Sequence, residues 1–148
     1  MNIKMKIFIF PPNSLILADL VERFGHKPLA LQNKIEKLVR NPEIDAPPLN
    51  ITDEILNRGL KYVTVETPAG IRGRLGVMNP LIEEAEAAII VNNAKYSFGC
   101  VGCYESGQYI IYLIKRKKIP ILEIEYPTDE NQAKEMIKKI RDFLSGLT

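Results

Sequence analysis

Residues 88–124 read AIIVNNAKYSFGCVGCYESGQYIIYLIKRKKIPILEI and form one unit of strand, loop, helix and strand. The apolar run Ala88–Val91 predicts a buried strand, and Ile119–Ile124 predicts a second strand. Between them, Tyr109–Lys117 has the length and apolar content of a helix. Two parallel strands need a crossover of this length, which is usually helical. The unit therefore predicts a parallel sheet that is covered by helices.

The rest of the chain repeats this alternation. Ser14 is a good N-cap for a helix that Gly25 ends, and Tyr62–Glu66 alternates with β-branched residues as a strand does. About five mostly parallel strands with helices on both faces predict a single Rossmann-like or flavodoxin-like α/β domain over residues 1–148. The other expected elements are strands at Ile7–Phe10 and Pro28–Leu31, and helices at 35–39, from Thr52 to Gly59, from Leu81 to Glu86 after Asn79-Pro80, and from a Thr128 cap onward.

Composition narrows the function classes. The chain has 148 residues, which suits one domain, and its net charge of +2 is too small to indicate a nucleic-acid partner. The longest apolar run, Tyr109–Ile114, is far shorter than the roughly 18 residues of a membrane span. Residues 1–6 lead directly into an expected strand, so we do not expect them to be a signal peptide. With two cysteines and no secretion signal, we expect a cytoplasmic protein without a membrane or nucleic-acid partner.

The two cysteines of the chain, Cys100 and Cys103, form a Cys-x-x-Cys pair between the strand and the helix quoted above. Ligands of layered α/β folds bind at such junctions. The pair suits a reversible disulfide, half of a tetrahedral zinc or iron–sulfur site, or a structural role as small buried hydrophobes. No second pair exists, and His26 is distant in sequence and expected at the surface. A four-ligand site therefore requires a zinc ion or cluster shared between chains or with a partner.

We expect Cys103 at or near the N-terminus of the following helix. The unpaired amides and the dipole of a helix N-terminus favour thiolate over thiol. Cys100 would then lie three residues upstream, within reach of the same ion. The two cysteines are the expected metal or redox residues.

A second candidate site would bind an anion. Thr67–Gly76 contains three glycines and two arginines, and we expect it to be a loop that meets the turn at Asn13 and Ser14 on one edge of the sheet. Arg72 and Arg74 could then hold phosphate or carboxylate together with the helix start at Ser14. The alternatives are a hairpin excursion with exposed arginines and plain helix capping by Ser14. Glycine-rich nucleotide-binding motifs are absent from the sequence.

The helix at Tyr109–Ile114 is apolar on nearly all sides. Such a helix is buried on more than one face, whereas the sheet of a small domain covers one side. We therefore expect part of it, with Tyr104 and Tyr109, to lie in a homodimer interface.

The C-terminal third resembles a known enzyme unit. GCVGCYESGQY at 99–109, KIPILEIEY at 118–126 and the closing helix to Phe143 are similar to the last unit of 2-hydroxyacyl-CoA dehydratase subunits, with Lys118 where that family has glycine. In those proteins a cluster-ligating cysteine precedes a helix. The resemblance implies that Cys100 or Cys103 faces a cluster.

The whole chain resembles a second family. KIFIFPPNSLILADLVERFGH at 6–26 and FGCVGC at 98–103 look like methanogenesis marker protein 5 of archaea. That resemblance implies a cytosolic accessory role connected with methyl-coenzyme M reductase and supplies no functional residues. We expect a non-enzymatic accessory or assembly protein with a possible partner in maturation of that reductase. The alternatives are a small thiol–disulfide enzyme and a small-molecule or anion-binding domain.

Overall fold

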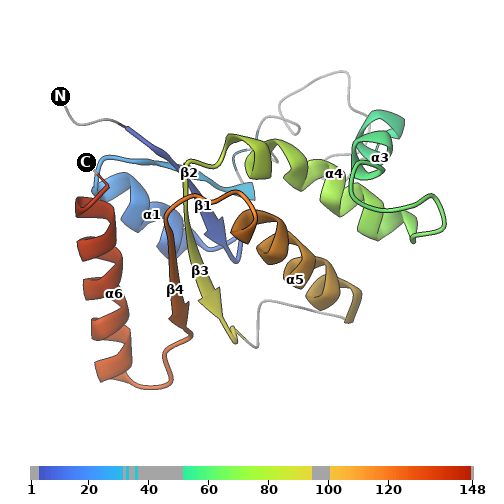
Figure 1. Ribbon diagram of the computed structural model, residues 1–148. Helices are drawn as coiled ribbons and strands as arrows, with labels where there is room; N and C mark the ends of the chain where they lie inside the picture. Colours follow the sequence, from blue (N-terminus) through green and yellow to red (C-terminus); the bar gives the residue numbers. More distant parts are fainter. Residues whose placement is uncertain (1–3, 32, 34–35, 37–51, 95–100, 148) are drawn as a thin grey trace.

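A computed structural model describes residues 4–31, 33, 36, 52–94 and 101–147. Within these residues the protein has one sheet of four parallel strands in the order β2-β1-β3-β4 (Figure 1). The α/β prediction is confirmed, with four strands in place of five. The predicted helix at 35–39 falls mostly outside the described residues. The elements are β1 (Lys6–Phe10), α1 (Leu15–Arg23), β2 (Lys27–Leu29), α3 (Asp53–Gly59), α4 (Ala69–Glu84), β3 (Ala87–Asn92), α5 (Val101–Lys115), β4 (Ile121–Glu125) and α6 (Glu130–Ser145).

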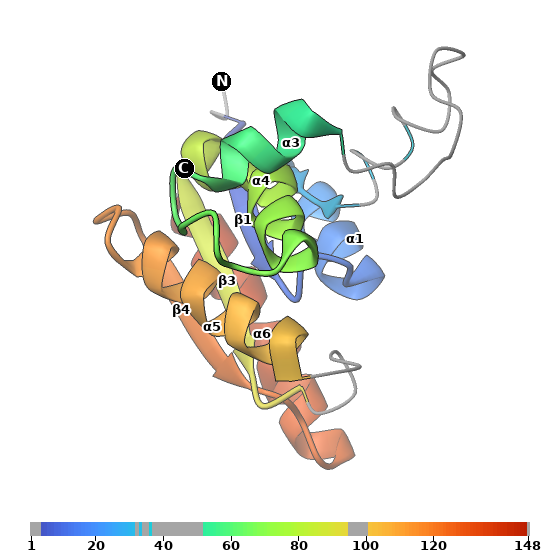
Figure 2. The same cartoon turned by 90° about the vertical axis from the view of Figure 1, so that its right-hand side faces the viewer.

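Helices cover both faces of the sheet, with α1 and α6 on one face and α4 and α5 on the other (Figures 1 and 2). The alternation of β1 divides the core accordingly. Ile7 and Ile9 belong to the apolar layer under α1 and α6, whereas Phe8 and Phe10 belong to the layer under α4 and α5. All four side chains are buried, as expected for a strand in the interior of a parallel sheet.

The end of α1 follows its sequence signal. Gly25 has a left-handed φ of 83°, its N–H donates to Glu22 O at 3.0 Å, and the next N–H, of His26, donates to Val21 O at 3.1 Å. This pair of bonds is a Schellman motif, which favours glycine at its left-handed position. The motif turns the chain toward β2 and directs the next side chain inward.

The prediction that His26 lies at the surface is wrong. Its side chain is 2% exposed. Nε2–H donates to Leu144 O in α6 at 3.0 Å, and Nδ1 accepts from the N–H of Met5 at 3.4 Å. These two contacts require the neutral ring protonated on Nε2. His26 therefore joins the start of β1 to the end of α6.

Residues 62–86 differ most from the predicted secondary structure. Tyr62–Glu66 is a series of turns, because the N–H of Tyr62 donates to Gly59 O and that of Thr67 donates to Thr64 O. The expected loop Thr67–Gly76 is mostly helix, since α4 begins at Ala69. The expected helix start at Asn79-Pro80 is the interior of the same helix.

Two glycines are required by the packing of this helix against α3. A Cβ on Gly76 would lie 1.9 Å from Ile55 O, and a Cβ on Gly59 would lie 2.1 Å from Arg72 O. Both glycines therefore allow the backbones of α3 and α4 to touch. Gly59 and Gly76 thus serve close packing of two helices, and not loop flexibility.

Two helix starts also differ from expectation. Thr52 caps α3 as predicted, but the side chain that caps α6 is Asp129, which accepts from the N–H of Gln132 at 2.8 Å, and not Thr128. Helix α5 begins at Val101, eight residues before the predicted Tyr109.

In the part of the chain that the structure describes, none of the helices has the length and apolarity that crossing a membrane requires.

Candidate functional site at the carboxyl edge of the sheet

The sheet has a topological switch point between β1 and β3. These strands are neighbours, but the helix after β1 lies on one face and the helix after β3 lies on the other (Figure 1). The two connections therefore diverge at the carboxyl ends of the strands, which is where ligands of open α/β sheets bind. This edge is the candidate functional site.

The β1–α1 turn forms one side of the candidate site. The N–H of Ser14 donates to Pro11 O at 3.1 Å, and Ser14 Oγ accepts from the N–H of Leu17 at 3.2 Å. Asn13 is exposed. Ser14 therefore acts as an N-cap and already satisfies one of the amides that an anion would need.

The end of β3 forms the other side and carries polar groups that sequence reasoning missed. Asn93 has a left-handed φ of 57°, and its Nδ2 donates to Glu125 in β4 at 2.5 Å. Asn92 Nδ2 donates to Glu123 at 3.3 Å. The available signals were two asparagines directly after a buried strand and alternating glutamates in the next strand.

Glu123 is also paired with a cation. Lys115 Nζ lies 3.0 Å from its carboxylate. The hydrogen bond from Lys115 is the largest cause that lowers the pKa of Glu123 below 4.5, and Asn92 adds to it, while partial burial opposes it. The carboxylate thus stays ionised and its charge is balanced by α5.

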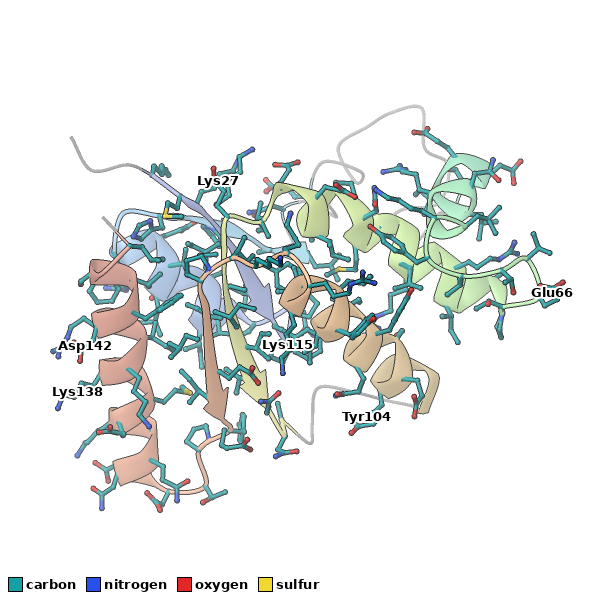
Figure 3. All side chains as sticks on the ribbon, viewed as in Figure 1. Lys27, Glu66, Tyr104, Lys115, Lys138 and Asp142 are labelled. Atoms are coloured by element: carbon teal, nitrogen blue, oxygen red, sulfur yellow. The ribbon has the colours of Figure 1, made fainter. Side chains whose placement is uncertain are left out.

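Cys103 lies in the first turn of α5, as predicted. It is half-buried, and its carbonyl accepts from Ser106 Oγ at 3.1 Å. The next residue, Tyr104, is 50% exposed and marks this end of the helix in Figure 3. Cys100 lies outside the described residues, so the geometry of the pair stays a prediction.

The two arginines are not in a loop beside Ser14. Arg72 and Arg74 lie on α4, and Figure 1 shows the first turns of α4 beside α3, on the side of the molecule opposite α1. Both are half-buried, and Arg72 Nε is buried without a hydrogen-bond partner among the described residues. The expected convergence with the Pro11–Ser14 turn is therefore wrong, while anion binding by the arginines themselves stays a prediction.

Comparison with known proteins places the chain in a family. A family model described as "Uncharacterized protein conserved in archaea (DUF2112)" matches residues 5–147. The chain belongs to this archaeal family. It is also similar to Uncharacterized protein MJ0404 of Methanocaldococcus jannaschii, with 61% identity over 142 residues that cover 96% of this chain and 95% of the relative. No solved structure matches the chain.

The donor set of this archaeal family member limits how it could hold a metal. Among the described residues, His, Cys, Asp and Glu side chains do not form a group of three or more that could ligate an ion. Cys103 and, by sequence, Cys100 supply two thiols per chain. A tetrahedral zinc site or a four-thiolate cluster needs four ligands, so the residues fit such a group only when another molecule supplies the remainder.

Proposed function

We propose that this protein is a non-enzymatic accessory or assembly protein of the methyl-coenzyme M reductase system, and that Cys100 and Cys103 contact a metal or iron–sulfur species. The resemblance to methanogenesis marker protein 5 and the membership of an archaeal family support this role. The observation on which it chiefly rests is the position of Cys103. This residue lies in the first turn of α5, which follows β3 at the topological switch point.

The local chemistry supports a thiolate at this position. The first N–H groups of a helix lack intrahelical acceptors, and the N-terminal end of the dipole favours negative charge. A thiolate is the form of cysteine that binds metals. A metal or cluster held here would supply its own redox or assembly chemistry, and the protein would bind and orient it at the sheet edge.

The rival function is thiol–disulfide exchange by the same pair. A helix N-terminus also suits a reactive thiolate in a Cys-x-x-Cys motif. The two functions differ in what occupies the sulfurs, because metal binding protects both thiols and redox cycling alternates them between thiol and disulfide. Metal content and thiol state therefore distinguish them.

The test compares anaerobically purified native protein with the Cys100→Ser, Cys103→Ser variant. We expect iron or zinc in the native protein and a decrease to background in the variant, with unchanged circular dichroism. Glu105→Gln, in the same turn of α5 as Cys103, is a matched control that should retain the metal. Equal metal content in native and double-serine proteins would overturn the proposal, and cyclic oxidation of the thiols without metal would favour the redox function.

A further inference from the structure

Among the described residues, the outer strand of the sheet has an edge without a neighbouring strand. β4 lies at one end of the order β2-β1-β3-β4 in the described sheet. Its ladder with β3 uses Pro120 O, which accepts from Ala88, and the N–H of Tyr126, which donates to Asn92. Backbone groups alternate in direction along a strand, so the N–H and C=O groups of the even-numbered residues of β4 point toward β3. The N–H and C=O groups of Ile121, Glu123 and Glu125 therefore face outward.

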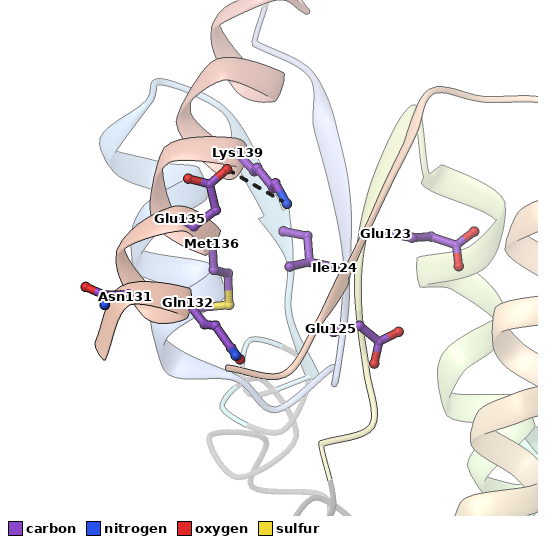
Figure 4. A pocket seen from close by; sticks show the side chains of 8 residues that line it. All are labelled: Glu123, Ile124, Glu125, Asn131, Gln132, Glu135, Met136 and Lys139. Carbon is purple, nitrogen blue, oxygen red and sulfur yellow. Dashed lines mark ion pairs between the residues drawn. The ribbon is translucent and has the colours of Figure 1, made fainter. Parts of the chain in front are cut away.

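A groove of about 600 Å³ runs beside this edge, between β4 and α6. Figure 4 shows that Ile124 and Met136 point into it, whereas Glu123 and Glu125 point away from α6. The remaining charges in the groove are Glu135 and Lys139, which form an ion pair of 3.9 Å. The groove is therefore apolar at its base and nearly neutral at its rim. Its other lining residues are Asn131 and Gln132.

Exposed apolar side chains lie around the same edge. Tyr126 after β4 is 45% exposed, Pro120 is exposed, and Leu122 is half-buried. The edge consists of the sheet and one helix layer on each of its faces. With each layer about 10 Å thick and about 24 Å long, this edge presents roughly 700 Å². This is close to the about 800 Å² that each partner of a stable complex buries.

We infer that this edge binds a second copy of the chain, with the two β4 strands antiparallel about a two-fold axis. A two-fold interface must be complementary to itself. The surface meets this condition, because Glu135 and Lys139 lie one turn apart on the side of α6 that lines the groove. With the axis midway between these two side chains, two antiparallel α6 helices bring Glu135 of each copy to Lys139 of the other.

The charged side chains of β4 determine the register in which the β4 strands of the two copies pair. Outward-facing residues must pair with outward-facing residues, so the axis passes through Leu122, Glu123 or Ile124. An axis at Glu123 sets two copies of Glu123 opposite each other, and an axis at Ile124 sets Glu123 opposite Glu125. Like charges directly opposite are unfavourable. An axis at Leu122 instead sets Glu123 opposite Ile121 and brings the two Leu122 side chains together.

This dimer has a consequence for the cysteine loops, although it does not depend on the proposed metal function. Antiparallel β4 strands direct the carboxyl edges of the two sheets to opposite ends of the assembly. Cys103 of one copy then lies far from Cys103 of the other. The missing ligands of a metal at this edge would come from a different protein, and not from the second copy.

The first test is mass in solution. Light scattering of the native protein at micromolar concentration should give twice the 16.8 kDa mass of the chain. Glu123→Pro removes one outward N–H without removing an N–H that β3 uses, and it should give a folded monomer. Glu123→Ala removes the same carboxylate but keeps the amide, and it should remain dimeric.

The second test fixes the register and does not depend on breaking the dimer. In the Cys100→Ser, Cys103→Ser background, Leu122→Cys should form an intermolecular disulfide on mild oxidation, because residues directly opposite in a non-hydrogen-bonded pair have Cα atoms about 4.5 Å apart. Glu123→Cys should cross-link at least tenfold more slowly. A monomeric native protein, or a dimer that persists in Glu123→Pro and does not cross-link through Leu122→Cys, would overturn the inference.

Discussion

Single glycines decide how closely α3 and α4 approach. Gly76 lies against Ile55 O, where a Cβ would be 1.9 Å from the oxygen, and neither backbone can move without disturbing its helix. We predict that Gly76→Ala lowers the free energy of unfolding by about 1–3 kcal/mol, as overpacking does. Gly70→Ala is the matched control on the same helix, since its Cβ would have no neighbour within 4 Å. It should raise stability by about 0.5–1 kcal/mol. Urea denaturation measures both, and equal effects would contradict the packing argument.

His26 is the second residue with a defined structural task. Removing its ring by His26→Ala leaves the N–H of Met5 and the carbonyl of Leu144 without their partner and opens a cavity. We expect a loss of about 2–4 kcal/mol in thermal or chemical unfolding. Its neighbour Lys27 is exposed and labelled in Figure 3, so Lys27→Ala should change stability by less than about 0.5 kcal/mol. A small effect of His26→Ala would show that the ring does not hold α6 to β1.

Glu123 predicts a pH dependence. Lys115 holds the pKa of this carboxyl below 4.5 in the folded protein. The pair therefore contributes stability above the unfolded pKa, and that contribution is lost as pH falls through the folded pKa. Because both side chains are partly exposed, the contribution is small and decreases with salt. In Lys115→Met the pKa of Glu123 should rise, as carboxyl titration by NMR would show. An unchanged pKa would contradict the assignment of Lys115 as its main cause.

At the scale of elements, the start of α1 tests whether Ser14 caps a helix or binds an anion. Ser14→Ala should cost about 1 kcal/mol of stability, whereas Ser14→Asp keeps a capping oxygen and should be nearly neutral. Phosphate should not raise the melting temperature of the native protein if capping is the full role. Stabilisation by phosphate that is lost in Ser14→Asp would instead support an anion site.

The elements that sequence reasoning predicted are those whose local signals and burial agree. Ile7–Phe10 and Ala88–Val91 are short apolar runs and are strands, and Gly25 ends α1 at a left-handed position. Tyr62–Glu66 was misread because its β-branched pattern is typical of a strand, although the tyrosine is anchored by helix packing: its OH donates to Asn79 in α4, and its carbonyl accepts from Tyr109. Such contacts are invisible in local periodicity.

The first part of α4, residues 69–80, was not predicted, for a related reason. Its glycines and Pro80 are unfavourable in an isolated helix, so local propensity favoured a loop over 67–76. The helix forms because it packs against α3, and at Gly59 and Gly76 the two backbones approach so closely that a larger side chain does not fit. Tertiary packing thus outweighed propensity over the whole segment.

In the whole molecule, the predicted parallel topology identified the edge of the sheet where the candidate site lies. It identified only some of the polar side chains at that edge. A parallel α/β sheet predicts that ligands bind where β1 and β3 diverge, and Cys103 lies there. Asn93 and Glu125 were missed, because their pairing depends on which strands are neighbours. The arginines of α4 were wrongly assigned to this edge, because the segment that contains them is a helix and not the loop after a strand.

The proposed function requires that Cys100 and Cys103 jointly ligate a metal at this edge. X-ray absorption at the zinc edge, on native protein loaded with one zinc per chain, counts the sulfur ligands directly. We expect two sulfur atoms at about 2.3 Å from the metal and their loss in the Cys100→Ser, Cys103→Ser variant. A shell of nitrogen and oxygen alone in the native protein would contradict it.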